Sequence, residues 1–375
     1  MRRLTALLLV LFAMAPRVAH AQQTVRDSAL ALFDQRKIRE AYPLLERAVV
    51  AHPTDIRLHE RLAFAILNAS GSLPDPEARK RERIRARAMF GKALTLGSKD
   101  LQVQAMFESI PEDGGGETRF SDVPAIDAAM RRAEAAYGSG EYRTALAEYQ
   151  KALALDSTLY AAALFSGDTY LHTQPIDSAF IWYDRATRID PDRETAWRYW
   201  SGTLLKQSRL DEAREKAIEA IVAEPYSRVS RQPLAVWAQT TRTRVALPRV
   251  VLPVRDTTAA PPAGWVAYDS VRRSWQGSGT TRSAAFAKAY PGEPRYRHSL
   301  AEELAAMRAA ATAGGADPAT RHIDTLDQAG MLEAYIFFAR ATQGIAEDYE
   351  AYRVSHRERL KRFWTEFVVG GKYER

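Results

Sequence analysis

His298, Glu302 and Glu303 are the residues whose types and spacing come nearest to a chemical site. On a helix they lie about one turn apart, so the imidazole would meet a carboxylate. A zincin site needs two histidines four residues apart with a glutamate between them, and none of the six histidines after residue 21 has that pattern. The spacing therefore predicts a hydrogen bond or ion pair at His298, and no metal site.

Motifs for other common reactions are also missing from the sequence. It has no G-x-S-x-G nucleophile motif, no phosphate-binding glycine loop and no dinucleotide fingerprint. The absence of cysteine excludes disulfides, thiolate metal sites, cysteine nucleophiles and a cysteine-linked lipid anchor. We predict a non-catalytic protein without a cofactor. The alternative is a catalytic site assembled from distant residues of 228–375.

The first 21 residues have the pattern of an export signal. Arg2 and Arg3 precede an apolar stretch from Leu4 to Ala15, and Ala19-His20-Ala21 has small residues at both cleavage-site positions. The apolar stretch is too short to cross a bilayer comfortably, and no longer apolar run occurs elsewhere in the sequence. We expect cleavage after Ala21 and a soluble mature protein that is periplasmic or secreted.

Charge is divided unevenly along the chain, whose formal net charge is +7. Residues 22–227 hold 28 lysines and arginines against 31 acidic residues, whereas residues 228–375 hold 22 against 15. The basic second part suits either an anionic envelope polymer or lipid, or an ordinary solvated surface. Export argues against nucleic acid as a partner.

Residues 126–227 read as three consecutive units of 34 residues, which begin at Ile126, Tyr160 and Glu194. Small residues recur at the eighth, twentieth and twenty-seventh places of each unit. An aromatic residue or alanine stands at the twenty-fourth place, and serine or proline at the thirty-second. The residues are Ala133, Gly167 and Ser201 at the eighth place; Ala145, Ala179 and Ala213 at the twentieth; Tyr149, Tyr183 and Ala217 at the twenty-fourth; Ala152, Ala186 and Ala220 at the twenty-seventh; and Ser157, Pro191 and Pro225 at the thirty-second. This spacing resembles the tetratricopeptide repeat (TPR) family over residues 22–227.

The resemblance implies that each unit is a helical hairpin. Small residues let its two antiparallel helices approach closely, and serine or proline follows the second helix. Because a single hairpin leaves an apolar face uncovered, several must stack, and the implied fold is an all-α, TPR-type superhelix. Earlier units begin at Gln22 and Ile56, which makes about five hairpins.

The unit that begins at Ile56 is longer than the others, by about eleven residues placed between its two helices. The extra residues include Gly71, Pro74 and Pro76, which favour turns and interrupt helices. We therefore expect an extended loop between the two helices of this unit.

A glycine-rich segment, residues 109–121, separates the repeats of 22–108 from those of 122–227. Gly114, Gly115 and Gly116 make it a candidate hinge, because a flexible linker would let the two groups of repeats move independently. Direct packing across the segment would instead give one continuous array.

Residues 228–375 are predicted to form a basic, mainly helical C-terminal domain. Helical spacing resumes over 264–275, whereas prolines make 244–254 extended, and the last helix should run from about Ala346 to Val368. The stripe of that last helix consists of Tyr349, Tyr352, Leu360, Phe363, Trp364 and Phe367. So large an apolar stripe should pack against the rest of the molecule.

The TPR resemblance also implies where a partner would bind, because in that family the first helix of each unit lines the concave surface. The candidate peptide-binding residues are Met130, Glu134, Tyr137, Leu164, Asp168, Leu171, His172, Arg198, Leu205 and Lys206. Glu134 and Asp168 stand where the family's carboxylate clamp has basic or amide residues, which contradicts such a clamp. Acidic and aromatic residues suit a basic or amphipathic segment, including the chain's own basic half, and an ordinary solvated surface is the alternative.

We therefore predict an exported, non-catalytic scaffold that binds a protein or peptide segment in this groove. The first alternative is an envelope hydrolase or glycan-processing factor whose repeats recruit substrate for a catalytic C-terminal domain. The second alternative is binding of an anionic polymer or lipid by residues 228–375.

Overall fold

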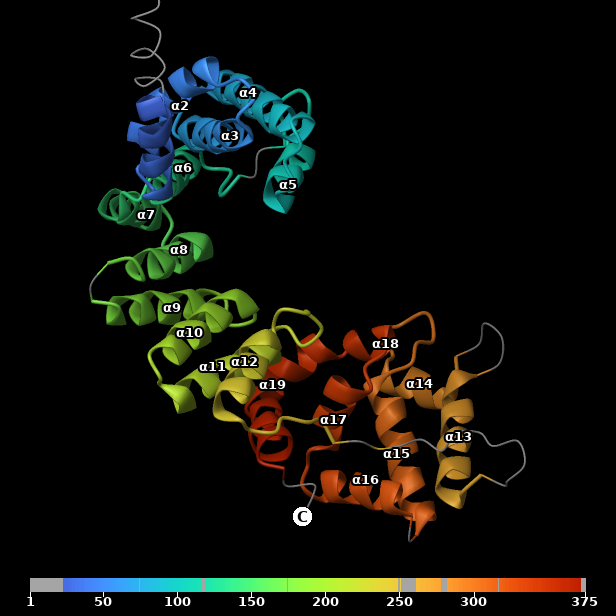
Figure 1. Cartoon of the computed structure of the whole chain (residues 1–375). Coiled ribbons are helices and arrows are strands. Elements are labelled where there is room, and N and C mark those ends of the chain that lie inside the picture. The colour runs from blue at the N-terminus through green and yellow to red at the C-terminus, as the bar shows by residue number, and fades with distance from the viewer. Residues whose placement is uncertain are drawn as a thin grey trace, which may run out of the picture. The chain divides into compact units, whose positions relative to one another are not determined.

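The structure is a computed structural model that describes residues 23–73, 75–116, 119–173, 175–248, 250, 261–277, 282–315 and 317–371. All regular secondary structure in these residues is helical, which confirms the predicted all-α class (Figure 1). The export signal predicted for residues 1–21 lies outside the described residues. The chain divides into two compact units, Met1–Asp190 (unit 1) and Pro191–Arg375 (unit 2), and each is described by itself.

Unit 1 consists of helical hairpins that follow the predicted repeats. Its helices are residues 23–34, α2 (Ile38–Ala51), α3 (Ile56–Gly71), α4 (Pro76–Thr95), α5 (Leu101–Ser109), α6 (Pro124–Gly138), α7 (Tyr142–Leu155), α8 (Tyr160–Tyr170) and α9 (Asp177–Ile189). Within this unit α3 packs on α4, α6 on α7 and α8 on α9 as hairpins, and α7 also packs on α8. The hairpins therefore stack on their neighbours, as the repeat spacing predicts.

The small residues of the repeat lie at the contact between the two helices of a hairpin. Ala145, Ala179 and Ala186 are fully buried. At Gly167 of α8, an added Cβ would lie 2.7 Å from the ring of Tyr183 and 3.3 Å from the carbonyl oxygen of Ala179. The eighth, twentieth and twenty-fourth places of that unit therefore meet in space, and only glycine fits at the eighth.

The extended loop predicted in the unit from Ile56 is wrong. Helix α3 continues to Gly71 and α4 begins at Pro76, so most of the extra residues lengthen helices, and α4 reaches 20 residues. The physical reason is local, because the Asp75 side chain accepts hydrogen bonds from the backbone N–H groups of Glu77 and Ala78. With proline at the first helical position, this cap starts a new helix at once.

The glycine-rich segment lies against α4 within unit 1. Arg83 donates hydrogen bonds of 2.8 Å to the carbonyl oxygens of Gly114 and Gly115. The helices on either side also meet directly, because Asn68 of α3 donates to the carbonyl oxygen of Ala135 in α6 at 3.0 Å. This is the arrangement expected of a continuous array rather than of a free hinge.

Unit 2 contains the fifth predicted hairpin and all the later helices. Its helices are α10 (Glu194–Lys206), α11 (Leu210–Ala223), α12 (Gln232–Thr241), α13 (Ala263–Gln276), α14 (Ala284–Ala289), α15 (Leu300–Gly314), α16 (Pro318–Gln328), α17 (Leu332–Ala339), α18 (Gln343–Ala346), α19 (Tyr349–Arg362) and the π-helix η1 (Phe363–Val369). Helix α11 packs on α10, α12 and α19, and α13 packs on α15. The predicted boundary at residue 228 therefore falls inside this unit, and the proposed domain limits stay a prediction.

The aromatic stripe of the last helix packs inside unit 2, as predicted. The Tyr349 hydroxyl donates to the carbonyl oxygen of Val222 in α11 at 2.7 Å. The rings of Phe338 and Trp364 meet edge to face at 5.2 Å between centroids. This packing joins the fifth hairpin to the C-terminal helices of unit 2.

The described residues contain neither a candidate membrane span nor a candidate metal site. No helix among them is both long and apolar enough for a membrane span. No group of three or more histidine, aspartate or glutamate side chains within them could hold a metal ion.

Candidate functional site

Two of the predicted groove residues in unit 1 belong to the protein core. Met130 on α6 has an exposure of 0%, and Leu164 on α8 has 4%. Both fill space between packed helices, which leaves them no surface for a ligand. The residues that resemblance places in a groove therefore divide into a buried set and an accessible set.

The accessible set gathers at the facing ends of α6 and α8. The Tyr137 hydroxyl lies 3.2 Å from a carboxylate oxygen of Asp168 and 3.1 Å from Nε2 of His172. Because a hydroxyl has one proton, donation to Asp168 requires His172 to donate in the second contact. The ring of Tyr142 stacks on His172 at 4.6 Å between centroids. We call Tyr137, Tyr142, Asp168 and His172 the Tyr137 cluster.

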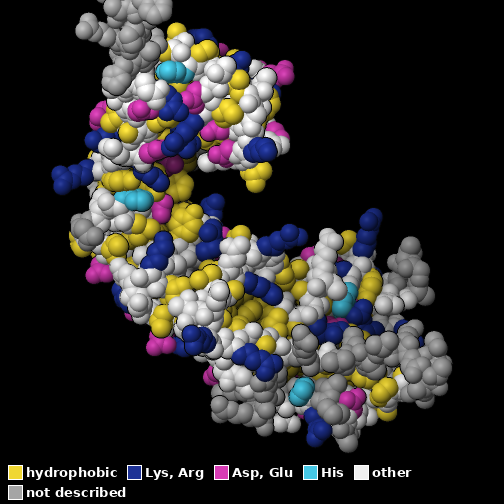
Figure 2. All heavy atoms as spheres, viewed as in Figure 1, with side chains coloured by type: hydrophobic (Ala, Val, Ile, Leu, Met, Phe, Trp, Pro, Cys, Tyr) yellow, Lys and Arg dark blue, Asp and Glu magenta, His cyan; other side chains and the backbone are white. Residues whose placement is uncertain are grey.

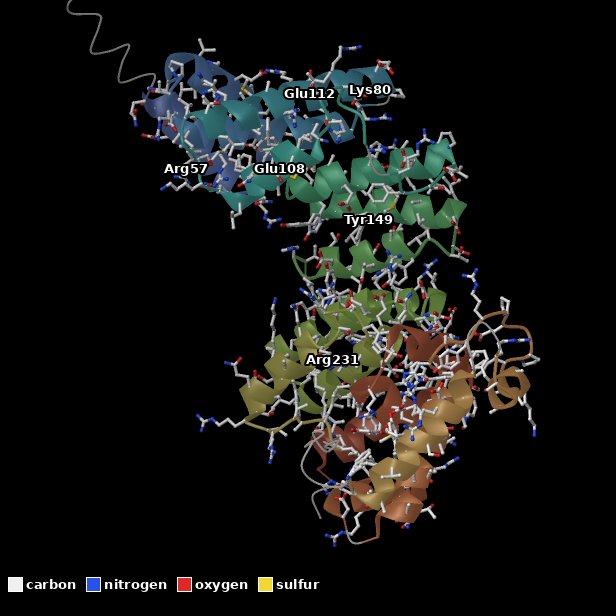
Figure 3. All side chains as sticks on the ribbon, turned by 90° about the vertical axis from the view of Figure 1, so that its right-hand side faces the viewer. Arg57, Lys80, Glu108, Glu112, Tyr149 and Arg231 are labelled. Atoms are coloured by element: carbon white, nitrogen blue, oxygen red, sulfur yellow. The ribbon has the colours of Figure 1, made fainter. Side chains whose placement is uncertain are left out.

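A more deeply placed acid–hydroxyl pair lies behind this cluster. The Tyr149 hydroxyl donates to the carboxyl group of Glu134, and Tyr149 is buried between the helices of unit 1 (Figure 3). Burial raises the pKa of Glu134, the hydrogen bond from Tyr149 opposes this rise, and the charge of Asp168 adds to it. Glu134 is half-buried, and its hydrogen bond with Tyr149 joins α6 to α7.

The electrostatics of the Tyr137 cluster suit recognition rather than proton transfer. Burial raises the pKa of the Tyr137 hydroxyl, and the neighbouring Asp168 carboxylate raises it further. The hydroxyl is therefore neutral near pH 7 and acts as a fixed donor. What the cluster offers a partner is aromatic surface and hydrogen-bonding groups held in fixed positions.

A surface cavity of about 740 Å³ opens beside the cluster, and we call it the Tyr142 cavity. It lies between the start of α7 and the end of α8, and its walls include Tyr142, Arg143, Leu146, Tyr170, His172 and Thr173. His172 is exposed and both tyrosines are half-buried. Glu141, also in the wall, is engaged by Arg39 at 3.2 Å. The cavity combines stacking, apolar and hydrogen-bonding surfaces.

The repeat pattern indicated His172 but missed Tyr142, Arg143 and Tyr170. Tyr142 and Arg143 begin the second helix of their repeat, whereas the family resemblance points to first-helix residues. The sequence signal that could have found them is Gly140, a turn-forming residue two places before Tyr142. In the structure Gly140 adopts a positive φ of 75° and turns the chain sharply at this point. Leu171, which the pattern also indicated, is half-buried next to His172.

The remaining predicted groove residues lie on α10 of unit 2. Arg198 is held by Glu194 at 2.7 Å, and its guanidinium lies 4.8 Å from the ring centroid of Tyr199. Leu205 is half-buried and Lys206 is exposed. The contacts of Arg198 are thus with residues of its own helix, and the charged group of Lys206 is exposed to solvent.

The basic C-terminal residues meet the fifth repeat mainly at its second helix. Arg357 of α19 contacts Glu219 at 3.0 Å and Asp192 at 2.8 Å, and Lys361 contacts Glu219 at 2.8 Å. Arg353 contacts Asp192 at 2.8 Å. These charges are therefore used to hold unit 2 together, and on the first helix α10 the Arg357 guanidinium lies 5.9 Å from the ring centroid of Trp197.

The contact predicted at His298 is confirmed, but it belongs to a buried cluster. His298 Nε2 lies 3.0 Å from Glu303, which also receives hydrogen bonds from Tyr268 at 2.7 Å and Arg340 at 2.5 Å. Burial alone would raise the pKa of Glu303, but the His298 hydrogen bond, the Arg340 charge and the Tyr268 hydrogen bond outweigh it and hold the pKa at about 2. With an exposure of 0%, Glu303 stays ionised and out of reach of a substrate.

Comparisons with known proteins place the chain in no family. No family model matches it, and no curated protein matches it. Among solved structures, the crystal structure of the MamA protein aligns with a TM-score of 0.27 and 14% identity over 55% of this chain and 93% of that one. The crystal structure of the P58(IPK) TPR domain aligns with a TM-score of 0.28 and 12% identity over 95% of this chain and 100% of that one. The class that the geometry itself defines is an all-helical protein of stacked hairpins.

Proposed function

We propose that this protein is an exported, non-catalytic scaffold that binds an amphipathic peptide or protein segment in the Tyr142 cavity. The single observation that supports this function is the Tyr137 cluster beside an open cavity. Aromatic rings supply contact area at low entropic cost, and such residues dominate binding energy at interfaces. The Asp168 carboxylate near the rings favours a segment with a basic side chain.

The proposed binding surface differs from the groove that repeat spacing indicated. Met130 and Leu164 are withdrawn from it because they are buried, and Tyr142, Arg143 and Tyr170 enter it. A segment that binds there would lie along the ends of the hairpins. Apolar groups would contact Leu146 and Tyr170 in the cavity walls. A basic group would extend beyond the walls toward Asp168, which lies 3.2 Å from the Tyr137 hydroxyl.

Selection from a random peptide display library against the full chain tests this function. We expect amphipathic peptides with at least one lysine or arginine, and binding at least tenfold weaker to Tyr142→Ala and to His172→Ala. Tyr42→Ala is the matched control. Tyr42 is also a half-buried tyrosine of unit 1, but it lies on α2 and accepts a hydrogen bond of 3.0 Å from Arg85 of α4. A library that yields no binder, or binders that tolerate both cavity variants, would refute the proposal.

Export is a separate part of the proposal and has its own test. It is supported by Arg2, Arg3, the apolar stretch Leu4–Ala15 and the small residues before Gln22. N-terminal sequencing of the protein from the cell envelope or medium should give a chain that starts at Gln22. An unprocessed chain that stays inside the cell would contradict it.

A further inference from the structure

A second cavity lies within unit 2 beside α12, and we call it the α12 cavity. Its volume is about 730 Å³, which is within the range of sites that hold small organic molecules. The walls come from α11, α12, the segment 243–247 and η1. Segments more than a hundred residues apart in the sequence therefore build it together.

The walls of the α12 cavity are mainly apolar. They include Ile221, Leu234, Leu247, Trp364 and Val368, and Leu234, Trp364 and Val368 are each less than 5% exposed. In the face shown in Figure 2, hydrophobic side chains gather over the region of α12 and α19, with lysine or arginine side chains at the edge. An apolar ligand body would find a preformed surface there.

The charged residues of the cavity are all positive. Arg231, Arg242 and Arg244 line it, and no aspartate or glutamate is among its described lining residues. Arg231 precedes the first residue of α12 (Figure 3). Its guanidinium lies 5.8 Å from the ring centroid of Trp364. Arg242 is exposed and forms no ion pair with a described residue. Three guanidinium groups beside an apolar surface favour an anion with an apolar body.

The indole of Trp364 adds an independent observation. Its Nε1–H is buried and has no hydrogen-bond acceptor within the described part of the chain. Buried indole N–H groups usually find an acceptor, because an unsatisfied donor is costly. Because Nε1 itself is covered by protein atoms, the part of the Trp364 side chain that a ligand in the cavity meets is apolar.

We propose that the α12 cavity binds a long-chain carboxylate, with its chain against Leu234, Leu247 and Trp364 and its carboxylate among the three arginines. Neither the peptide-binding function nor the family resemblance implies this ligand. A bidentate guanidinium–carboxylate contact fixes the head group, and burial of methylene groups supplies most of the affinity. A cation of the same chain length would bring its charge among like charges and would bind poorly.

Titration of the full chain with dodecanoate, below the concentration at which it forms micelles, provides the first test. We expect saturable binding that is at least tenfold tighter than that of dodecyltrimethylammonium, which has the same chain and the opposite charge. Equal affinity for the two compounds would show simple hydrophobic adsorption and would overturn the proposal. Binding to phosphatidylglycerol vesicles without binding of free dodecanoate would also overturn it, because the surface rather than the cavity would then be acting.

Variants locate the ligand in the cavity. Arg242→Gln with Arg244→Gln should weaken dodecanoate at least tenfold, whereas Arg273→Gln with Arg295→Gln removes two exposed arginines of unit 2 elsewhere and should leave affinity unchanged. Ala238→Leu narrows the cavity and should also weaken binding. Full affinity in both cavity variants would refute the proposal.

A spectroscopic readout remains informative where a variant changes the fold. Dodecanoate brominated at its chain end should quench tryptophan fluorescence, because bromine quenches at contact distance. Trp364→Phe should remove most of this quenching while the helical circular dichroism is retained. Quenching that survives in Trp364→Phe would place the ligand elsewhere and overturn the proposal.

Discussion

The Tyr142 cavity and the α12 cavity have almost the same volume, but different kinds of side chain line them. The first, in unit 1, lies where two hairpins meet, and its walls include Tyr142 and His172 of the Tyr137 cluster. The second, in unit 2, has apolar walls and three arginines. One hollow thus forms between neighbouring hairpins and the other between segments far apart in the sequence, and the side chains in their walls decide what each can bind.

The two units also differ in how their interiors are held together. Unit 1 relies on small residues and close helix contact, as at Gly167 and Ala179. Unit 2 adds a buried charge cluster in which Glu303 is surrounded by Arg272, Arg340 and His298. The stability of unit 1 should therefore respond to volume changes, and that of unit 2 to charge changes.

Removal of the central charge of unit 2 should have the largest effect. Glu303→Ala leaves the half-buried Arg340 without this carboxylate and Arg272 with Glu302 alone, and we expect a loss of about 3–5 kcal/mol in the free energy of unfolding. Hydrogen exchange should show the loss in peptides from α13, α15 and α17, and little change in peptides from α6 to α9. Glu358→Ala is the control, because that side chain is 83% exposed. An equal loss of hydrogen-exchange protection in both units would show that the stability of unit 2 does not depend specifically on this charge cluster.

Acid should weaken unit 2 through the same residue. The pKa of Glu303 in the folded protein is about 2, against an ordinary value of 4.5. Because the folded value is the lower one, the stabilisation is complete above about pH 4.5 and is lost as the pH falls through 2. We expect about 3 kcal/mol of acid-sensitive stability that Glu303→Gln lacks. Matching acid profiles for the wild type and Glu303→Gln would disprove this assignment.

Two glycine substitutions should shift the stability of the two units in opposite directions. Gly167→Ala places a methyl group 2.7 Å from the ring of Tyr183, and overpacking of this kind costs about 1–3 kcal/mol. Gly202→Ala in α10 meets no atom within 4 Å, so the gain in helix propensity should stabilise unit 2 by about 0.5–1 kcal/mol. Chemical denaturation with local hydrogen exchange measures both. A stable Gly167→Ala protein would mean that the contact relaxes freely.

The smallest loss of stability expected is that of Tyr149→Phe, which removes one hydroxyl from unit 1. Glu134 then loses the hydrogen bond from Tyr149, and we expect a loss of about 1 kcal/mol. The pKa of Glu134 should rise further, since that hydrogen bond lowers it. Carboxyl titration by NMR would detect the change, and an unaltered pKa would show that the hydroxyl does not act on Glu134.

The sequence by itself determined the features that depend on contacts within one repeat. Small residues at the eighth and twentieth places predicted that the helices carrying Gly167 and Ala179 would approach closely, and they do. The contact between Gly167 and the ring of Tyr183 is a finding of the structure. The sequence also predicted the helical hairpins, the aromatic stripe of the last helix and the contact between His298 and the adjacent glutamate. Such contacts join residues that are close in the chain, so the packing of one helical hairpin or one helix start is enough to form them.

Only the tertiary structure decided which of the predicted groove residues are accessible. Met130 and His172 both occupy places that the repeat family uses for binding, yet Met130 is in the core and His172 is exposed. The α12 cavity likewise combines Ile221 with Trp364, and Glu303 combines partners from Tyr268 to Arg340. Repeat spacing specifies the helix and its inner face, but burial depends on which side chains from distant segments fill the space around it.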